Sequence, residues 1–372
     1  MVKKILIVDK DEATRNLVSY HLTRLDYEVY TAVSSKSAIN KAIHHVPDIL
    51  IFDVATTKKD GFGILKEIRS YKDLRNIIAI VVTASANKED VINAIRMGAN
   101  DYVLKPLKIG NLLAKLVQWS NTEMEEQWKS LQPEQENTLR LIKVTIERVV
   151  DSVKHKEPLP YEDIVNAVEV LENTIKEFGA QDILSAVYGY NNTMFLHSLL
   201  VAVFMYLFAE LKGFDSQECK LMTIGGLMHD LGNVLIPNDL LFKPDKLDPE
   251  EYKNIKEHVN YIMDILNAMS GVPEIVKDIC WSHHEKMDGS GYPRGLKGSD
   301  INTPARMLAV VEAYAALTTK NVYRETYATE DAVKMLFKPE GHLDPELIKD
   351  FERSLLNGFK TKNKEKQPSD TV

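Results

Sequence analysis

Histidines and carboxylates in the second half of the chain have the types and spacing of metal ligands. His229 and Asp230 are adjacent after an apolar run, and His283 and His284 are adjacent further on. Imidazole and carboxylate groups gain nothing from apolar surroundings unless they have a partner. Iron, manganese and zinc all accept this mixture of ligands. The pattern therefore predicts a metal site, with His197 upstream and His258 downstream as further candidate ligands.

Helical patterns must position these side chains. The expected helices are Asn192–Leu211 with His197, Ser216–Leu231 with His229 and Asp230, a helix from Asp248 with His258, Pro273–Ser282 before His283, and a helix from Thr303 with Glu312. A bundle that projects histidines and carboxylates inward is a known way to build a two-metal site. A single histidine near an apolar face is usually an ordinary core residue. Five of the ten histidines fall in this constellation, however, and that favours a metal site.

A short loop follows the paired histidines. Glu285 to Pro293 contains two glycines and a proline around Tyr292, a composition that favours a tight turn. Such a loop can form one wall of a pocket over the metal ions. The His-Asp pair, the His-His-Glu sequence and Gly291-Tyr292-Pro293 together closely resemble the HD-GYP family. The resemblance extends from about Gln181 to Phe359.

The HD-GYP resemblance implies an all-α domain with a metal-dependent phosphodiesterase activity in bacterial signalling. Its usual substrate is cyclic di-GMP, which is opened to linear pGpG and in some members to GMP. Two divalent ions, iron or manganese, would be bridged by Asp230, and His229 and Asp230 would form the catalytic pair. The resemblance implies these metal ligands: His197, His229, Asp230, His258, His283, His284 and Glu312. It implies substrate contacts at Gly291, Tyr292, Arg324 and Asn233.

Several positions depart from the family pattern. Asn233 stands where the family has a phosphate-contacting lysine, Asn321 replaces an arginine, and Glu312 is one methylene longer than the usual aspartate. Thr193 replaces a glutamate that helps some members to hold a third ion. These departures predict slow turnover with two ions per chain. Two alternatives stay open: a cyclic-dinucleotide sensor or scaffold with little turnover, and a phosphodiesterase for another phosphoester.

Four short apolar runs in the first part of the chain each end at a polar residue. The runs Ile5–Val8, Asp48–Phe52, Ile78–Val82 and Tyr102–Leu104 lead to Asp9, Asp53, Thr83 and Lys105, and helical patterns follow. Buried strands that alternate with helices predict an α/β doubly wound fold with a parallel sheet. Sites in such sheets lie beyond the carboxyl ends of the strands. The four polar residues should therefore meet there.

Residues 1 to about 121 resemble a response-regulator receiver domain on these residues and on Asp60-Gly61 and Pro106. The resemblance implies Asp53 as phosphoacceptor, Asp9 as a magnesium ligand, Thr83 and Lys105 as phosphoryl contacts, and a sensor histidine kinase as partner. Lys10 stands where the family has a second acid, so one magnesium ligand is missing and magnesium binding is in doubt. Thr56-Thr57 replaces the usual Met-Pro. The alternative is a receiver fold kept only for dimerisation or docking.

Two amphipathic helical patterns connect the parts. Apolar residues recur at spacings of three and four between Leu139 and Val153 and again within Tyr161–Phe178. Ordinary packing is the first interpretation, and pairing with a second copy in a homodimer is the other. The expected organisation is a receiver-like domain at 1–121, a helical linker at 122–160, an HD-type helical bundle at 161–360 and a disordered tail at 361–372.

Charge and composition restrict the environment of the protein. Residues 1–121 contain 18 Lys and Arg against 13 Asp and Glu, and the remainder contains 28 against 41. An acidic second part is unsuited to general nucleic-acid binding. Cys219 and Cys280 are too few for a disulfide scaffold and fit a reducing cytoplasm. No signal peptide precedes the first strand pattern, and Met194–Ala209 is shorter than the roughly 20 residues that span a membrane. We therefore expect a cytoplasmic protein outside the membrane.

Overall fold

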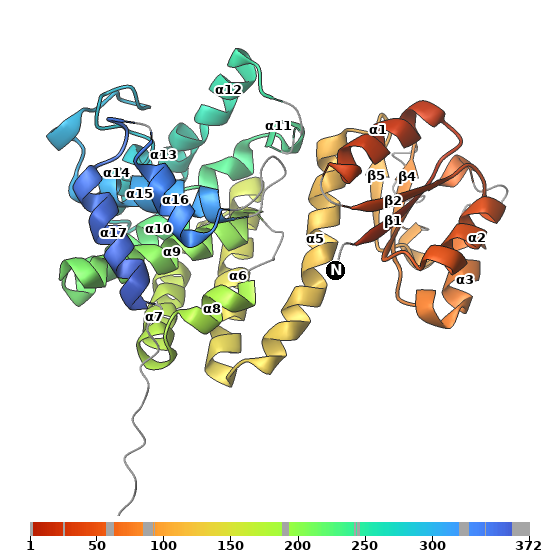
Figure 1. Cartoon of the computed structure of the whole chain (residues 1–372), viewed down its shortest axis with the longest axis horizontal. Helices are drawn as coiled ribbons and strands as arrows, with labels where there is room; N and C mark the ends of the chain where they lie inside the picture. The colour runs from red at the N-terminus through yellow and green to blue at the C-terminus, as the bar shows by residue number, and fades with distance from the viewer. Residues whose placement is uncertain are drawn as a thin grey trace, which may run out of the picture. The chain divides into compact units, whose positions relative to one another are not determined.

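The computed structural model describes residues 3–24, 27–56, 63–84, 92, 94–187, 193–241, 243, 246–319, 327–338 and 340–358. Its contacts divide the chain into two compact units (Figure 1). The first unit comprises Met1–Trp119 with Asn238–Lys246, and the second comprises Ser120–Pro237 with Leu247–Val372. Residues 122–160, expected to form a helical linker, are thus grouped with the helical unit.

The first unit contains a parallel five-stranded sheet in the order β2-β1-β3-β4-β5. The strands are β1 Lys4–Val8, β2 Glu28–Ala32, β3 Ile49–Asp53, β4 Ile78–Thr83 and β5 Asp101–Leu104. Four of them follow the predicted apolar runs. The edge strand β2 was not predicted, because only Ala32 of its five residues is buried and it therefore lacks a continuous apolar run.

Helices cover both faces of this sheet. They are α1 Glu12–Thr23, α2 Ser35–His45, α3 Gly63–Ser70 and α5 Ile109–Gln127. Alternate residues of β1 supply the two faces: Leu6 packs with residues of α2 and α3, and Ile5 packs with residues of α1 and α5. The predicted α/β doubly wound fold is confirmed.

The second unit is helical. Its helices are α6 Pro133–His155, α7 Tyr161–Phe178, α8 Gln181–Val187, α9 Thr193–Lys212, α10 Ser216–Met228, α12 Pro249–Lys256, α13 His258–Ala268, α14 Glu274–Ser282, α15 Thr303–Thr318, α16 Thr329–Leu336 and α17 Pro345–Gly358; the short α11, Asn238–Leu241, is grouped with the first unit. The buried stripe of α6, which includes Ile142 and Ile146, belongs to the core of this unit and packs against α7. The ordinary-packing interpretation accounts for this stripe.

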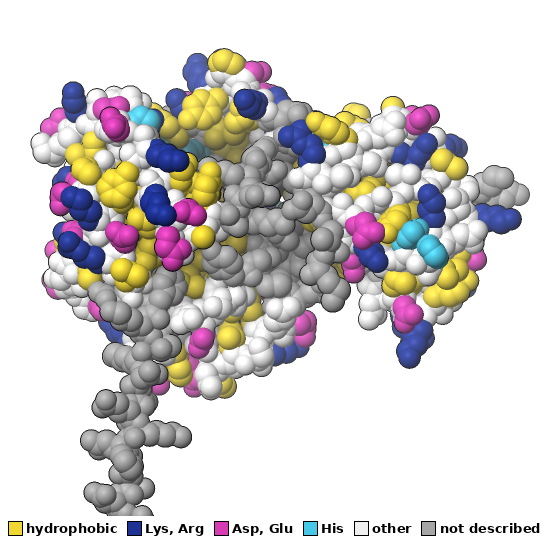
Figure 2. Space-filling model, in the orientation of Figure 1, with side chains coloured by type: hydrophobic (Ala, Val, Ile, Leu, Met, Phe, Trp, Pro, Cys, Tyr) yellow, Lys and Arg dark blue, Asp and Glu magenta, His cyan; other side chains and the backbone are white. Residues whose placement is uncertain are grey.

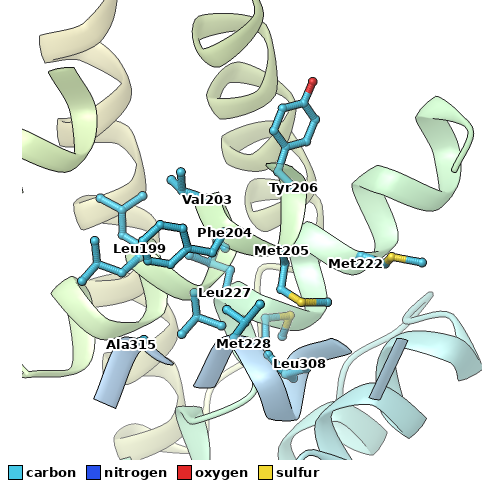
Figure 3. Close-up of a cluster of buried hydrophobic side chains, with 14 of the residues drawn as sticks. Leu199, Val203, Phe204, Met205, Tyr206, Met222, Leu227, Met228, Leu308 and Ala315 are labelled. Atoms are coloured by element: carbon cyan, nitrogen blue, oxygen red, sulfur yellow. The ribbon is translucent and has the colours of Figure 1, made fainter. Parts of the chain in front are cut away.

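Helix α9 lies at the centre of the helical unit. It packs against α10, α15 and α17. Figure 3 shows Leu199 and Phe204 of α9 gathered with Leu227 of α10 and Ala315 of α15. The segment Met194–Lys212 is long and apolar enough to cross a membrane, yet 72% of its most apolar window is buried inside the unit. Most of this helix is therefore packed inside the helical unit, as a core helix is.

Two helix boundaries differ from expectation. The helix that begins after Asp248 does not run on through His258, because α12 ends at Lys256 and α13 begins at His258. Helix α10 ends at Met228, and Leu231–Leu235 forms a short 3-10 turn, η4, instead of continuing the helix. Both breaks place candidate ligands at helix ends.

Figure 2 shows acidic and basic side chains interspersed over the visible face of each unit.

Candidate metal centre

Helix ends and one close backbone approach bring the candidate ligands together. His229 caps the carboxyl end of α10, and Asp230 follows it outside the helix. A Cβ atom on Gly232 would lie 2.0 Å from the carbonyl oxygen of His258. Only glycine therefore lets η4 lie directly against the start of α13. This approach carries Asp230 to His258.

The Asp230 carboxylate lies between two groups of histidines. Its Oδ2 atom is 3.9 Å from Nε2 of His197 and 3.8 Å from Nε2 of His229. Its Oδ1 atom is 3.4 Å from Nε2 of His258 and 4.0 Å from Nε2 of His283. Ligands at about 2.0–2.1 Å from a shared ion lie roughly 3–4 Å apart. The two oxygens thus face two separate groups at ligand-to-ligand spacing.

Glu312 of α15 completes the first group. Its Oε2 atom is 2.6 Å from Nε2 of His197 and 3.2 Å from Nε2 of His229. The extra methylene of glutamate does not carry the carboxylate out of the cluster. His284 completes the second group, since ligand atoms of His258, His283 and His284 lie within 4.8 Å of one another, as do those of His197, His229 and Asp230.

Backbone carbonyls determine which nitrogen of three rings is free. Nδ1 of His229, His258 and His283 lies 2.8, 2.8 and 2.6 Å from the carbonyl oxygen of Gly226, Ile255 and Cys280, respectively. A carbonyl only accepts, so Nδ1 carries the proton and a neutral ring presents an Nε2 lone pair.

The free nitrogens need a cation. Nε2 atoms of His258 and His283 face each other at 3.4 Å, and the buried Nε2 of His229 has no hydrogen-bond partner. Lone pairs pointed at one another and at carboxylates are unfavourable until a positive charge lies among them. The residues therefore fit a divalent metal, with backbone carbonyls as the outer partners that orient ligating histidines.

Charges within the cluster shift its titration. Burial opposes ionisation of Glu312, but His197 and His229 hold the pKa of this carboxyl well below its usual range. Burial likewise disfavours the charged form of His197, yet Glu312 and Asp230 raise its pKa to about 9. In the second group, burial and the neighbouring His258 lower the pKa of His284 to about 4. Burial and the neighbouring His284 likewise lower the pKa of His283, so His283 and His284 are held neutral, which is the state that binds metal.

The Gly-Tyr-Pro loop packs directly on the cluster. The Tyr292 ring stacks on His284, with 4.7 Å between ring centroids. A Cβ atom on Gly291 would lie 2.4 Å from the backbone nitrogen of Lys286 and 2.5 Å from Cα of Glu285. Gly291 was predicted to contact substrate, and the structure gives it a definite packing role: it lets the loop lie against the segment after His284.

Glu285 is a residue whose role the sequence did not reveal. Its side chain is buried and accepts hydrogen bonds from the backbone nitrogens of Arg294 at 2.7 Å and Leu296 at 2.9 Å. These bonds close the loop behind Tyr292. A buried acid directly after two ligands was the available signal, because such a group requires polar partners.

The structure describes only some of the other predicted site residues. Asn233 lies half-buried in η4, three residues after Asp230. Arg324, predicted as a substrate contact, lies outside the described residues, as does Asn321. The same holds for the side chain of Thr193, although its backbone begins α9.

The receiver residues meet at the carboxyl ends of the strands, as predicted. Lys105 Nζ is 3.0 Å from Asp9 Oδ2 and 3.4 Å from Asp53 Oδ2. Thr83 is the last residue of β4 and pairs in register with Leu104, next to Lys105. The side chain of Lys10 is exposed, so the lysine that pairs with Asp53 is Lys105.

Thr56 contacts the predicted phosphoacceptor, a role that was not predicted from the sequence. Its buried hydroxyl donates to Asp53 Oδ2 at 3.0 Å and accepts from the backbone nitrogen of Lys10 at 3.0 Å. The residue that replaces the usual methionine thus holds the predicted phosphoacceptor. Asp60, Gly61 and Thr57 lie outside the described residues.

Comparisons with known proteins agree with the two predicted domains. The HD domain family matches residues 182–347, and the response regulator receiver domain family matches residues 5–117. A probable cyclic di-GMP phosphodiesterase of Vibrio cholerae is 26% identical over 359 residues, which cover 93% of this chain and 76% of the relative. The cyclic di-GMP phosphodiesterase response regulator RpfG of Xanthomonas campestris is 25% identical over 351 residues, covering 92% and 85%.

A third relative carries a different name. The 3'3'-cGAMP-specific phosphodiesterase 2 of Vibrio cholerae is 33% identical over 192 residues, which cover 51% of this chain and 36% of that protein. The two family matches fall on the two units that the structure separates. The chain therefore joins a response regulator receiver domain to an HD domain.

Proposed function

We propose that the helical unit is a two-metal phosphodiesterase that opens cyclic di-GMP to linear pGpG under the control of the receiver. The observation that carries the proposal is the placement of Asp230, whose two carboxylate oxygens face two different groups of histidines. A carboxylate in that position would be a ligand shared by two ions, one held by each group. The names of two relatives that cover most of this chain support the choice of substrate.

Each side chain has a role in this chemistry. His197, His229 and Glu312 would hold one ion and His258, His283 and His284 the other, with Asp230 shared. Two bound divalent ions supply Lewis acidity toward the phosphoryl oxygens and a nucleophile derived from water. Attack by the oxygen of water forms a new bond to phosphorus and breaks the bond to the 3'-oxygen, which leaves with a proton. The product is a linear dinucleotide with a 5'-phosphate and a free 3'-hydroxyl.

The protein itself contributes orientation and access. The carbonyl bonds to Nδ1 of His229, His258 and His283 fix the rings before any ligand binds, which is the preorganisation that electrostatic catalysis requires. The side chains of Asp230, Glu312 and His197 remain 21%, 19% and 16% exposed, while His229 and His283 are fully buried. His284 of the second group is also partly exposed, so both groups keep some contact with solvent.

The direct test combines metal content with turnover. Protein purified without oxygen should bind two iron or manganese ions per chain and convert cyclic di-GMP to pGpG. Asp230→Ala should lose metal and activity together, because both groups lose the shared ligand. His155→Ala, which removes an exposed histidine outside the cluster, should change neither. Retention of full activity by Asp230→Ala, or a metal-loaded parent without turnover, refutes the proposal.

A second substrate has a specific observation in its favour. A relative that is 33% identical over 192 residues of this chain is named for 3'3'-cGAMP. Both cyclic dinucleotides carry two phosphodiester groups, so the metal chemistry is the same and only base contacts differ. Parallel measurement of kcat/KM for the two substrates decides between them. A larger value for 3'3'-cGAMP reassigns the substrate and leaves the reaction unchanged.

Control by the receiver would begin at Asp53. A sensor histidine kinase is the partner that would supply its phosphoryl group. Lys105 and Thr56 already contact the acceptor carboxylate, so phosphorylation must rearrange both contacts. Turnover of the full chain before and after treatment with a small phosphodonor tests this control, and unchanged turnover with a labelled Asp53 refutes it.

A further inference from the structure

A lysine outside the ligand set lies beside the loop over the metal centre. Lys256 is at the end of α12, two residues before His258. Its Nζ atom lies 4.8 Å from the centroid of the Tyr292 ring and 4.6 Å from that of Tyr252, one helical turn earlier. Tyr292 in turn stacks on His284. A single aromatic ring thus connects the Lys256 ammonium to the second metal-binding group.

The observed contacts of the Lys256 ammonium are with aromatic rings. Among the described residues, no carboxylate lies within 4.0 Å of its Nζ atom, whereas Lys277 and Lys220 pair with Glu274 and Glu169 at 2.8 and 2.5 Å. Its contacts are two tyrosine rings, which stabilise an ammonium without cancelling its charge. The Tyr252 side chain is itself 51% exposed. An oriented cation beside an accessible aromatic ring is suited to an anionic, ring-bearing ligand.

We infer that Lys256 binds the second phosphodiester of the cyclic dinucleotide, the one that is not being cleaved. The inference rests on the proposed function, which places the scissile phosphodiester at the metal ions. A cyclic dinucleotide holds its two phosphodiesters in one ring, so the other anion must lie near the edge of the cluster. Lys256 supplies a positive charge at that edge, where Tyr292 separates it from the metal ligands.

Loss of a contact to the second phosphodiester should change different kinetic constants from loss of a metal ligand. A contact to a remote group binds the ground state and the transition state alike, so its loss raises KM more than it lowers kcat. Removal of one charge-assisted hydrogen bond should lower kcat/KM by about 10- to 100-fold. A substrate with a single phosphodiester should not be affected at all, because it has no second anion.

The experiment compares three variants of the full chain loaded with metal. Lys256→Met removes the charge and keeps the apolar stem, Lys256→Arg keeps the charge, and Lys253→Met removes an exposed lysine from the same helix. Each is assayed with cyclic di-GMP and with bis(p-nitrophenyl) phosphate, and the metal content is counted. We expect Lys256→Met alone to raise KM for cyclic di-GMP by about 10- to 100-fold, with two ions bound and unchanged cleavage of the small diester.

The outcomes separate the inference from the proposed function. Equal KM values for Lys256→Met and Lys253→Met overturn the inference while the proposed function stands. Equal losses on both substrates also overturn it, because Lys256 then supports the metal centre itself. A parent that cleaves the small diester but neither binds nor cleaves a cyclic dinucleotide refutes both. Recovery of KM by Lys256→Arg supports a role for charge over one for packing.

Discussion

Gly291→Ala tests whether the Gly-Tyr-Pro loop must lie directly on the metal centre. The new Cβ atom would meet the backbone of Lys286 at 2.4 Å and of Glu285 at 2.5 Å. Neither atom can move away by a side-chain rotation, so the loop must shift by about 1 Å to reach an ordinary contact of 3.4 Å. Tyr292, the next residue, shifts with it and loses its stacking on His284.

The size of the effect follows from that displacement. Forcing a methyl group into a packed site costs about 1–3 kcal/mol of stability. A misplacement of roughly 1 Å at a site of reaction costs on the order of 10²-fold in rate. We therefore expect kcat/KM of Gly291→Ala for cyclic di-GMP to fall by about 100-fold. Metal content should stay at two ions per chain, since the ligands themselves do not move.

Gly298→Ala is the matched control in the same segment. Gly298 has a φ of +55°, and a Cβ atom there meets nothing within 4 Å. Alanine in this left-handed conformation costs roughly 1–2 kcal/mol, so the two variants should lose similar amounts of stability in thermal unfolding. Only Gly291→Ala should lose activity. Equal kcat/KM values for the two variants would show that the position of the loop does not matter for turnover.

Three further variants test other parts of the structure. Asn233→Lys should raise kcat/KM for cyclic di-GMP by about 10- to 100-fold by restoring a cation; an unchanged rate in steady-state assays refutes that explanation of slow turnover. Lys10→Asp should increase magnesium-dependent labelling of Asp53 by acetyl phosphate, and stoichiometric labelling of the parent contradicts it. Burial raises the pKa of Glu172 despite its bond to Thr223. The folded state therefore favours the protonated acid. The free energy of unfolding falls as pH rises from the ordinary pKa of a glutamate through the raised pKa of Glu172. Glu172→Gln should accordingly raise the Tm at neutral pH, by about 2–4 °C per kcal/mol, and a lower Tm at pH 7 and at pH 5 alike argues against it.

Much of the architecture could be predicted because burial leaves a pattern in the sequence. Strands β1, β3 and β4 are mostly buried and appear as continuous apolar runs, and β5 contains the short apolar run Tyr102–Leu104. The polar residues at the ends of these runs meet as expected. The edge strand β2 has no such run and was missed. The break between α12 and α13 was also missed, because Glu257 has no helix-breaking residue type and the break depends on η4 packing against α13.

The candidate ligands could be predicted from residue type, but their supporting contacts could not. Histidines next to carboxylates indicate a metal site from residue type and spacing alone, whatever the fold. The roles of Glu285 and Thr56 depend instead on which backbone nitrogens the fold brings near them. The contact between Lys256 and Tyr292 likewise depends on two segments that the fold brings together. Contacts between segments far apart in the sequence leave no local pattern to find.

The carbonyl partners of the three histidine rings have a consequence for how this domain tolerates mutation. In many metal sites a second side chain orients each histidine and must be inherited along with it. Here Gly226, Ile255 and Cys280 orient the rings through main-chain oxygens, each three residues before its histidine. Main-chain oxygens exist whatever the side chain, so these positions place no demand on residue identity for orientation. The orientation of the three rings is therefore inherited with the helix ends, whereas close packing, as at Gly232, still restricts residue identity nearby.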